Sequence, residues 1–148
     1  MKKVHFSPTI AMVIIALLLC TITIQAQNIT LNITGIKSAK GQMVVSVFKD
    51  NQTFKDEKPA TKLQFSKAAI TNGTLTVSIT LEPGTYGIAL MDDENSNGKM
   101  EKNMFGIPKE GFGFSNFYLS GMSRPVFNDF KFDVKNTPLK LESKMRYM

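Results

Sequence analysis

An oxygen-rich stretch of the chain has the residue types and the spacing of a calcium loop. From Asp93 it follows the pattern D-x-N-x-N-G, in which side-chain oxygens two residues apart converge because a glycine permits a sharp turn. In a twelve-residue loop of this kind, side chains supply oxygens at the first, third, fifth and ninth positions and a backbone carbonyl at the seventh. The predicted ligands of the ion are Asp93, Asn95, Asn97, the carbonyl of Lys99, and Glu101.

The twelfth position of this loop departs from an EF-hand. It is Met104, whose thioether is a poor ligand for a hard cation, and no helical pattern flanks the loop. Asp92, Glu94 or Glu110 would complete the coordination shell if the chain folds back. Alternatively, Asp and Asn form Asx-turns around Gly98 without any metal. The sequence leaves a structural calcium ion and a metal-free turn open as equal alternatives.

Glycines and aromatic residues alternate directly after this loop, between residues 106 and 116. Glycines let the backbone come close to another surface while the rings cover it. Such a run forms either an exposed platform for a ligand or a lid over the protein's own end, and the lid is the favoured interpretation. If the run is a platform for a sugar or a peptide, the candidate ligand-binding residues are Glu110, Phe112, Phe114 and Asn116.

The first residues have the three parts of a secretory signal peptide. Two lysines precede an apolar run, and Ala26 is a small residue at a plausible cleavage site. The apolar stretch is shorter than the roughly 20 residues of a spanning helix, which favours a cleaved signal over a membrane anchor. We therefore expect a signal peptide at residues 1–26 and one domain at residues 27–148, periplasmic or extracellular, with no membrane span after cleavage.

Cleavage would remove side chains on which much catalysis depends. The only histidine is His5, the only cysteine is Cys20, and the chain has no tryptophan. The remaining domain then cannot have a Ser-His-Asp triad, a Cys-His pair, a histidine-ligated zinc ion or a disulfide. The formal net charge of the whole chain is +6, but its basic residues are scattered among acidic ones. We expect no enzyme and no nucleic-acid partner.

Seven short segments show strand alternation of apolar and polar residues. Asn72-Gly73, a strong hairpin signal, separates two of them, and no segment has helical apolar spacing. The pattern predicts an all-β fold: a single antiparallel β-sandwich of about seven strands, Ig-like or prealbumin-like, with a partly open barrel as the alternative. Residues 92–126 are predicted to be one long loop, ordered by its apolar content. The strand segments are 29–33, 43–47, 63–65, 75–81, 86–90, 130–134 and 139–147, and residues 49–60 are predicted to be a polar loop.

Three runs of sequence together resemble a family of small secreted bacterial proteins, domain of unknown function 2141. They are Leu-Glu-Pro-Gly-Thr-Tyr-Gly from Leu81, Asp-Glu-Asn-Ser-Asn-Gly-Lys from Asp93, and Phe-Gly-Ile-Pro-Lys-Glu-Gly-Phe-Gly-Phe-Ser from Phe105. The resemblance implies a single sandwich domain after a signal peptide, and the Pro-Gly-Thr-Tyr turn is also similar to that of prealbumin-like sandwiches. The chain has Asp92 where the family usually has histidine, and Glu101 where it usually has aspartate. Both changes keep or add carboxylate oxygen, which suits a hard cation and not zinc.

Three functions from different classes follow from these patterns. The first is a non-enzymatic exported module that binds an envelope component, a glycan or a protein through the loop. The second is a polysaccharide hydrolase that uses only carboxylates. The third is a structural subunit that offers an edge strand to a partner. The hydrolase would use two of Asp92, Asp93, Glu94, Glu101 and Glu110, and the edge strands would be residues 28–36 and 139–147.

Overall fold

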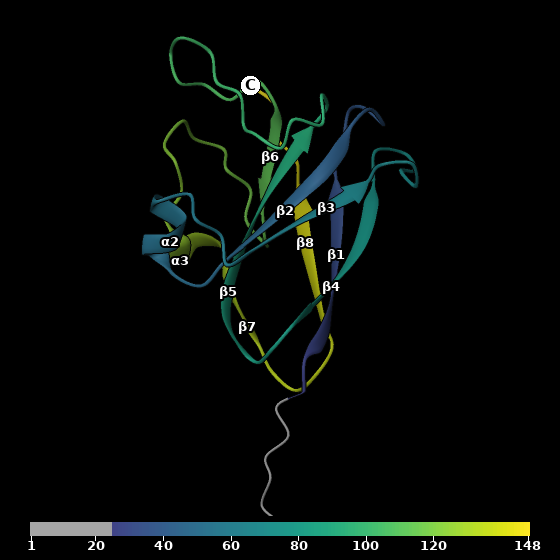
Figure 1. Cartoon of the computed structure of the whole chain (residues 1–148), viewed down its shortest axis with the longest axis vertical. Helices are drawn as coiled ribbons and strands as arrows, with labels where there is room; N and C mark the ends of the chain where they lie inside the picture. Colours follow the sequence, from purple (N-terminus) through teal and green to yellow (C-terminus); the bar gives the residue numbers. More distant parts are fainter. Residues whose placement is uncertain (1–24) are drawn as a thin grey trace, which may run out of the picture.

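The strands of the chain form two β-sheets that pack face to face (Figure 1). The computed structural model describes residues 25–148, so almost all of the predicted signal peptide lies outside the described residues. One sheet has three strands in the order β4 (Leu75–Leu81), β1 (Gln27–Thr34) and β8 (Leu139–Lys144). The other has five: β3 (Thr61–Ser66), β2 (Gln42–Phe48), β5 (Gly84–Asp93) and β6 (Gly111–Phe114) in that order, with β7 (Lys131–Val134) also paired to β5.

Two short helices, α2 (Asn51–Lys55) and α3 (Phe127–Phe130), lie beside the five-stranded sheet (Figure 1). In the part of the chain that the structure describes, neither helix is long or apolar enough to cross a membrane. The predicted all-β sandwich is confirmed, because strands dominate and the sheets share one interior. Helix α2 lies in the segment predicted to be a polar loop. Its Asp50 N-cap accepts a hydrogen bond from the Thr53 backbone, and its only buried residue is Phe54.

One strand, β6, was not predicted, because it lies inside the segment expected to be a long loop. All four of its residues, Gly-Phe-Gly-Phe, are buried. A strand that is covered on both faces has no polar side to alternate with the apolar one, so the period of two is lost. Strand β6 pairs with the second half of β5, and β7 pairs with its first half.

The expectation of purely antiparallel sheets is wrong for one pair, since β1 and β8 run parallel. The chain crosses from β7 in one sheet to β8 in the other, and this crossing brings β8 up alongside β1 in the same direction. Strand β1 lies between β4 and β8, so residues 28–36 are not an edge. Strand β8 is the outer strand of its sheet, and just beyond its end Arg146 exchanges two backbone hydrogen bonds with Phe112 of β6, Phe112 N to Arg146 O at 2.9 Å and Arg146 N to Phe112 O at 2.7 Å.

The Asn72-Gly73 turn forms as predicted, but it does not join two paired strands. Asn72 and Gly73 both have positive φ, 51° and 71°, and Thr71 and Thr74 exchange backbone hydrogen bonds across them. Beyond that single bridge the chain separates, because β3 pairs with β2 and β4 pairs with β1. The turn therefore carries the chain from one sheet to the other.

Two apolar cores flank the five-stranded sheet. The main core fills the sandwich interior with every second residue of the strands, such as Leu31 of β1 and Ile88 of β5. The second core lies on the outer face of the five-stranded sheet and is almost entirely phenylalanine. Its rings pack mostly edge to face, with centroids 4.8–6.4 Å apart. Its buried members are Phe48, Phe54, Phe112, Phe114, Phe127 and Phe130.

Removing the ring at the centre of this second core will destabilise the protein strongly. Phe130 is 1% exposed and contacts the rings of Phe54, Phe114 and Phe127. We expect Phe130→Ala to lower the free energy of unfolding by about 3–5 kcal/mol, measured by urea denaturation. The matched control is Phe105→Ala, a ring that is 80% exposed, for which the change should stay within about 0.5 kcal/mol. Equal effects of the two substitutions would contradict the second core.

Candidate functional site

We call one end of the sandwich the loop end. This end carries residues 94–110, and strand β5 finishes there with Asp92 and Asp93, which are both fully buried. Because successive residues of a strand point to opposite faces, Asp92 points into the sandwich interior and Asp93 toward the outer face. A buried carboxylate must find partners on its own face, so each of the two organises a separate set of contacts.

Asp93 holds the start of the predicted calcium loop through hydrogen bonds. Its Oδ2 accepts from Gln42 Nε2 at 2.7 Å and from the Gly98 backbone at 2.8 Å, and its Oδ1 accepts from the Asn97 backbone at 3.1 Å. Burial opposes ionisation of this carboxyl, but the donated hydrogen bonds outweigh it, and the pKa of Asp93 is lowered below 3.8. Lys62 Nζ donates to the Gly98 carbonyl at 2.6 Å and ties the loop to β3.

The remaining predicted ligands are engaged in Asx-turns. Asn95 Oδ1 accepts from the Asn97 backbone at 3.0 Å, and Asn97 Oδ1 accepts from the Lys99 backbone at 2.7 Å. The amides of both asparagines donate to Glu101 Oε1, at 3.2 and 3.0 Å. The side-chain oxygens that would bind calcium thus accept from N–H groups. Residues 25–148 contain no grouping of three His, Cys, Asp or Glu side chains suited to a metal.

Asp92 makes contacts that the sequence did not predict. Lys67, which is 1% exposed, pairs directly with its Oδ1, and the Tyr147 hydroxyl donates to its Oδ2. The Lys37 backbone donates to the Tyr147 oxygen at 3.1 Å. Burial and the hydrogen bond to Asp92 raise the pKa of Tyr147 well above its usual value. The signal for Lys67 was its register, since it continues the inward positions Leu63 and Phe65 beyond the end of β3.

Glu110 is the third buried carboxyl group of the loop end. Its Oε2 accepts from the Glu101 backbone at 3.3 Å, whereas its buried Oε1 has no hydrogen-bond partner. Burial, together with the negative charges of Asp93, Glu101 and Asp92, raises its pKa above 4.5. Glu110 lines a cavity of about 210 Å³, whose other lining residues are Glu94, Asn95, Glu101, Lys109, Gly111 and Tyr147.

Residues 101–109 form a small hairpin, which we call the tip hairpin. Asn103 organises it: its backbone donates to the Ile107 carbonyl at 2.9 Å, and its Oδ1 accepts from the backbones of Phe105 and Ile107 at 2.9 and 3.0 Å. At its turn the side chains of Met104 and Phe105 are 90% and 80% exposed. Two large apolar side chains are therefore presented to solvent by a backbone that is internally bonded.

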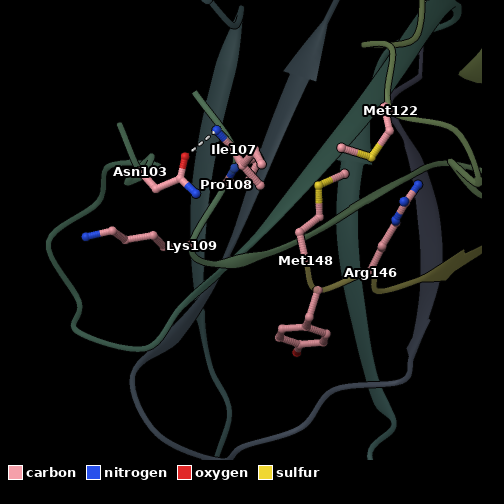
Figure 2. A pocket seen from close by; sticks show the side chains of 8 residues that line it. Asn103, Ile107, Pro108, Lys109, Met122, Arg146 and Met148 are labelled. Atoms are coloured by element: carbon pink, nitrogen blue, oxygen red, sulfur yellow. Dashed lines mark hydrogen bonds between the residues drawn. The ribbon is translucent and has the colours of Figure 1, made fainter. Parts of the chain in front are cut away.

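A second cavity, of about 510 Å³, opens beside the tip hairpin (Figure 2). Met122 and Met148 point toward each other across it, and Arg146 stands next to them. Arg146 Nη1 donates to the carbonyls of Leu119 and Gly121, which fixes the segment that carries Met122. The two cavities share Lys109 and Tyr147. The remaining lining residues of the larger one are Asn103, Ile107 and Pro108.

The residues predicted as a ligand platform have other positions. Phe112 and Phe114 are buried in the second core, so they do not form an exposed aromatic shelf and the lid interpretation describes them better. Asn116 has a positive φ of 49°, and its Oδ1 accepts a hydrogen bond from the backbone of Glu142 in β8 at 2.9 Å. Of the four predicted residues, only Glu110 lines either of the two cavities described above.

The model of a known protein family matches residues 31–142, which run from β1 to β8. The chain belongs to this family, described as "Uncharacterized protein conserved in bacteria (DUF2141)". The predicted resemblance is thereby confirmed. Searches of the curated proteins and of the solved structures gave no match. The description of DUF2141 names no activity or ligand, so the function of this member depends on the geometry of its loop end.

Glu110 makes the stability of the fold depend on pH in a defined direction. Since its pKa is above 4.5 in the folded chain, the folded state holds the proton more tightly than the unfolded state, and stability falls as pH rises through that window. We expect Glu110→Gln to remove this fall, because glutamine is neutral at every pH. In thermal melts the variant should exceed the wild type at pH 7 and lose this advantage well below pH 4.5. A wild-type advantage at pH 7 would contradict the assignment.

Proposed function

We propose that the chain is an exported, non-enzymatic β-sandwich module that binds a partner in the cell envelope or outside the cell through its loop end. The observation that carries this proposal is the tip hairpin, which presents Met104 and Phe105 to solvent. Exposed apolar side chains are common singly, but two neighbours at the turn of an internally bonded hairpin indicate a contact surface.

The surroundings of the tip hairpin support this use. The adjoining cavity of about 510 Å³ is lined by Met122 and Met148, and methionine adapts its shape to varied apolar partners. The side chains of Lys99, Lys102 and Lys109, in or next to the hairpin, are exposed, as is that of Glu101. Exposed apolar side chains with three lysines and one glutamate nearby suit a partner that is apolar at its centre and mainly anionic at its rim, as envelope components are.

The position at which β1 begins is compatible with an exported protein that binds its partner through the tip hairpin. Strand β1 begins at the end of the sandwich opposite the tip hairpin (Figure 1). The first residues of the domain therefore lie away from the proposed binding surface. The proposed location is the periplasm or the outside of the cell, on the strength of the basic, apolar and small-residue pattern of residues 1–26.

Binding to isolated envelope fractions tests the proposal. We expect the chain to co-sediment with envelope membranes or insoluble wall glycan of the bacterium that carries it, and Met104→Ser with Phe105→Ser to weaken that binding at least about tenfold. Protease treatment of the membranes distinguishes a protein from a lipid partner. The control is Val126→Ser, which changes an exposed apolar residue outside the hairpin and should bind as the wild type does. Equal binding of wild type and double variant would contradict the proposal.

The carboxylate hydrolase has weaker support. Asp92 and Asp93 are fully buried and bonded, which leaves Glu94, Glu101 and Glu110 at the cavity of about 210 Å³ as candidates for an acid and a base. If the same wall glycan were cleaved by the wild type and not by Glu101→Gln, the hydrolase would replace the binding module.

We further propose that the loop 93–101 is held by its Asx-turns and needs no calcium. All its predicted side-chain ligands already accept hydrogen bonds within the loop end. A calcium ion would have to displace several of these bonds. We expect the melting temperature to be the same in calcium, in magnesium and in chelator. A calcium-specific increase would contradict this proposal and support a calcium site with Asp93, Asn95, Asn97, Lys99 and Glu101 as its ligands.

A further inference from the structure

Lys67 and Asp92 form an ion pair in which both side chains are fully buried. The other ion pairs found in residues 25–148, those of Glu57 with Lys102 and with Arg124, lie at the surface. Nζ of Lys67 contacts Oδ1 of Asp92 directly, and the Tyr147 hydroxyl donates to Oδ2. An amine and a carboxyl group are thus held against each other inside the sandwich, where bulk water does not reach them.

We propose that Lys67 and Asp92 become joined covalently in the folded chain by an amide bond between Nζ of Lys67 and Cγ of Asp92. The ammonium group passes one proton to the carboxylate, which leaves a neutral amine and a neutral carboxylic acid. The amine lone pair attacks Cγ and forms the C–N bond. One C–O bond breaks, and the departing hydroxyl takes a second proton from the nitrogen and leaves as water. No electrons are gained or lost, and no co-reactant is needed.

The site supplies what this reaction requires. Burial of two opposite charges is costly, and formation of the amide removes both charges from the interior. Contact between Nζ and Oδ1 holds the amine and the carboxyl group together in one chain, which replaces a bimolecular encounter by an intramolecular one. The Tyr147 hydroxyl, bonded to Oδ2, stabilises the negative charge that develops on that oxygen during the attack. Tyr147 acts here as a positioning and charge-stabilising residue.

The bond would connect strands that are not neighbours. Lys67 follows the end of β3 and Asp92 lies near the end of β5, with β2 between them. The link therefore fastens three strands at the loop end and closes a covalent ring through residues 67–92. Tyr147, whose hydroxyl contacts Asp92, also lines the cavity of about 210 Å³ at the loop end, and the released water would have to leave past this side chain. The described residues contain no cysteine and therefore no disulfide. The amide would cross-link the fold without an oxidant.

The mass of the denatured wild-type chain tests the bond directly. The full chain is purified from cells that express it, its N-terminus is read from a peptide map, and its intact mass is compared with that calculated for the sequence. We expect a deficit of one water, and a branched peptide in the digest that joins the segment of Lys67 to that of Asp92. A mass without deficit, or a deficit located in any other segment, would overturn the proposal.

Substitutions of Lys67, of Asp92 and of a surface lysine test which atoms form the bond. Lys67→Arg retains the positive charge but replaces the nucleophilic amine, so its mass should equal the calculated one. Asp92→Asn should form the same amide with the loss of ammonia instead of water. Lys102→Arg alters the exposed pair with Glu57 and should retain the full deficit. A deficit that persists in Lys67→Arg would contradict the assignment of the nitrogen.

The role of Tyr147 has its own measurement. Chain made by cell-free synthesis is sampled over time, and the fraction with the mass deficit is followed for wild type and for Tyr147→Phe. We expect the variant to form the bond at least about tenfold more slowly, since one lost oxyanion donor costs that much or more. Circular dichroism of the same samples shows whether the variant is folded. Equal rates in folded wild type and folded variant would remove Tyr147 from the reaction.

Discussion

The loop end depends on two consecutive carboxylates that the alternation of a strand sends to opposite faces of one sheet. Asp92 enters the sandwich and Asp93 the outer face, and both are fully buried. An unpaired buried carboxylate would cost several kcal/mol, so each one requires hydrogen-bond donors or a cation beside it. Asp92 brings together Lys67 and Tyr147, and Asp93 brings together Gln42 and the backbone of residues 97–98.

These contacts explain how an irregular segment of the chain is held in place without a large core of its own. Asp93 and the two asparagines fold the acidic loop back onto Glu101. Glu101 is the first residue of the tip hairpin, and its backbone N–H donates to Glu110 Oε2. The hairpin is closed by its own backbone hydrogen bonds, from Lys109 N to Glu101 O and from Asn103 N to Ile107 O, and the chain continues through Glu110 into β6. These bonds let Met104 and Phe105 stay exposed in a defined orientation, which is what a binding surface requires.

The strands with one wet face could be predicted from sequence because their alternation has a period of two, as on β1 and β4. Strand β6 could not, because burial of Phe112, Phe114 and both glycines removes the polar face. The acidic residues of the loop end were recognised as a group, but their partners were not. Lys67 lies 25 positions from Asp92 and Tyr147 lies 55 positions from it, and only the register of the folded sheets shows that they meet.

The claim that Asp93 holds the loop end is tested most directly by amide hydrogen exchange. In the wild type, the backbone N–H groups of Asn97 and Gly98 donate to Asp93 and should exchange slowly for a surface loop. In Asp93→Ala we predict that protection is lost across residues 94–110 while the amides of β1 and β4 keep theirs. Unchanged protection of residues 97–98 in that variant would show that the loop is held by something other than the buried carboxylate, and would contradict this account.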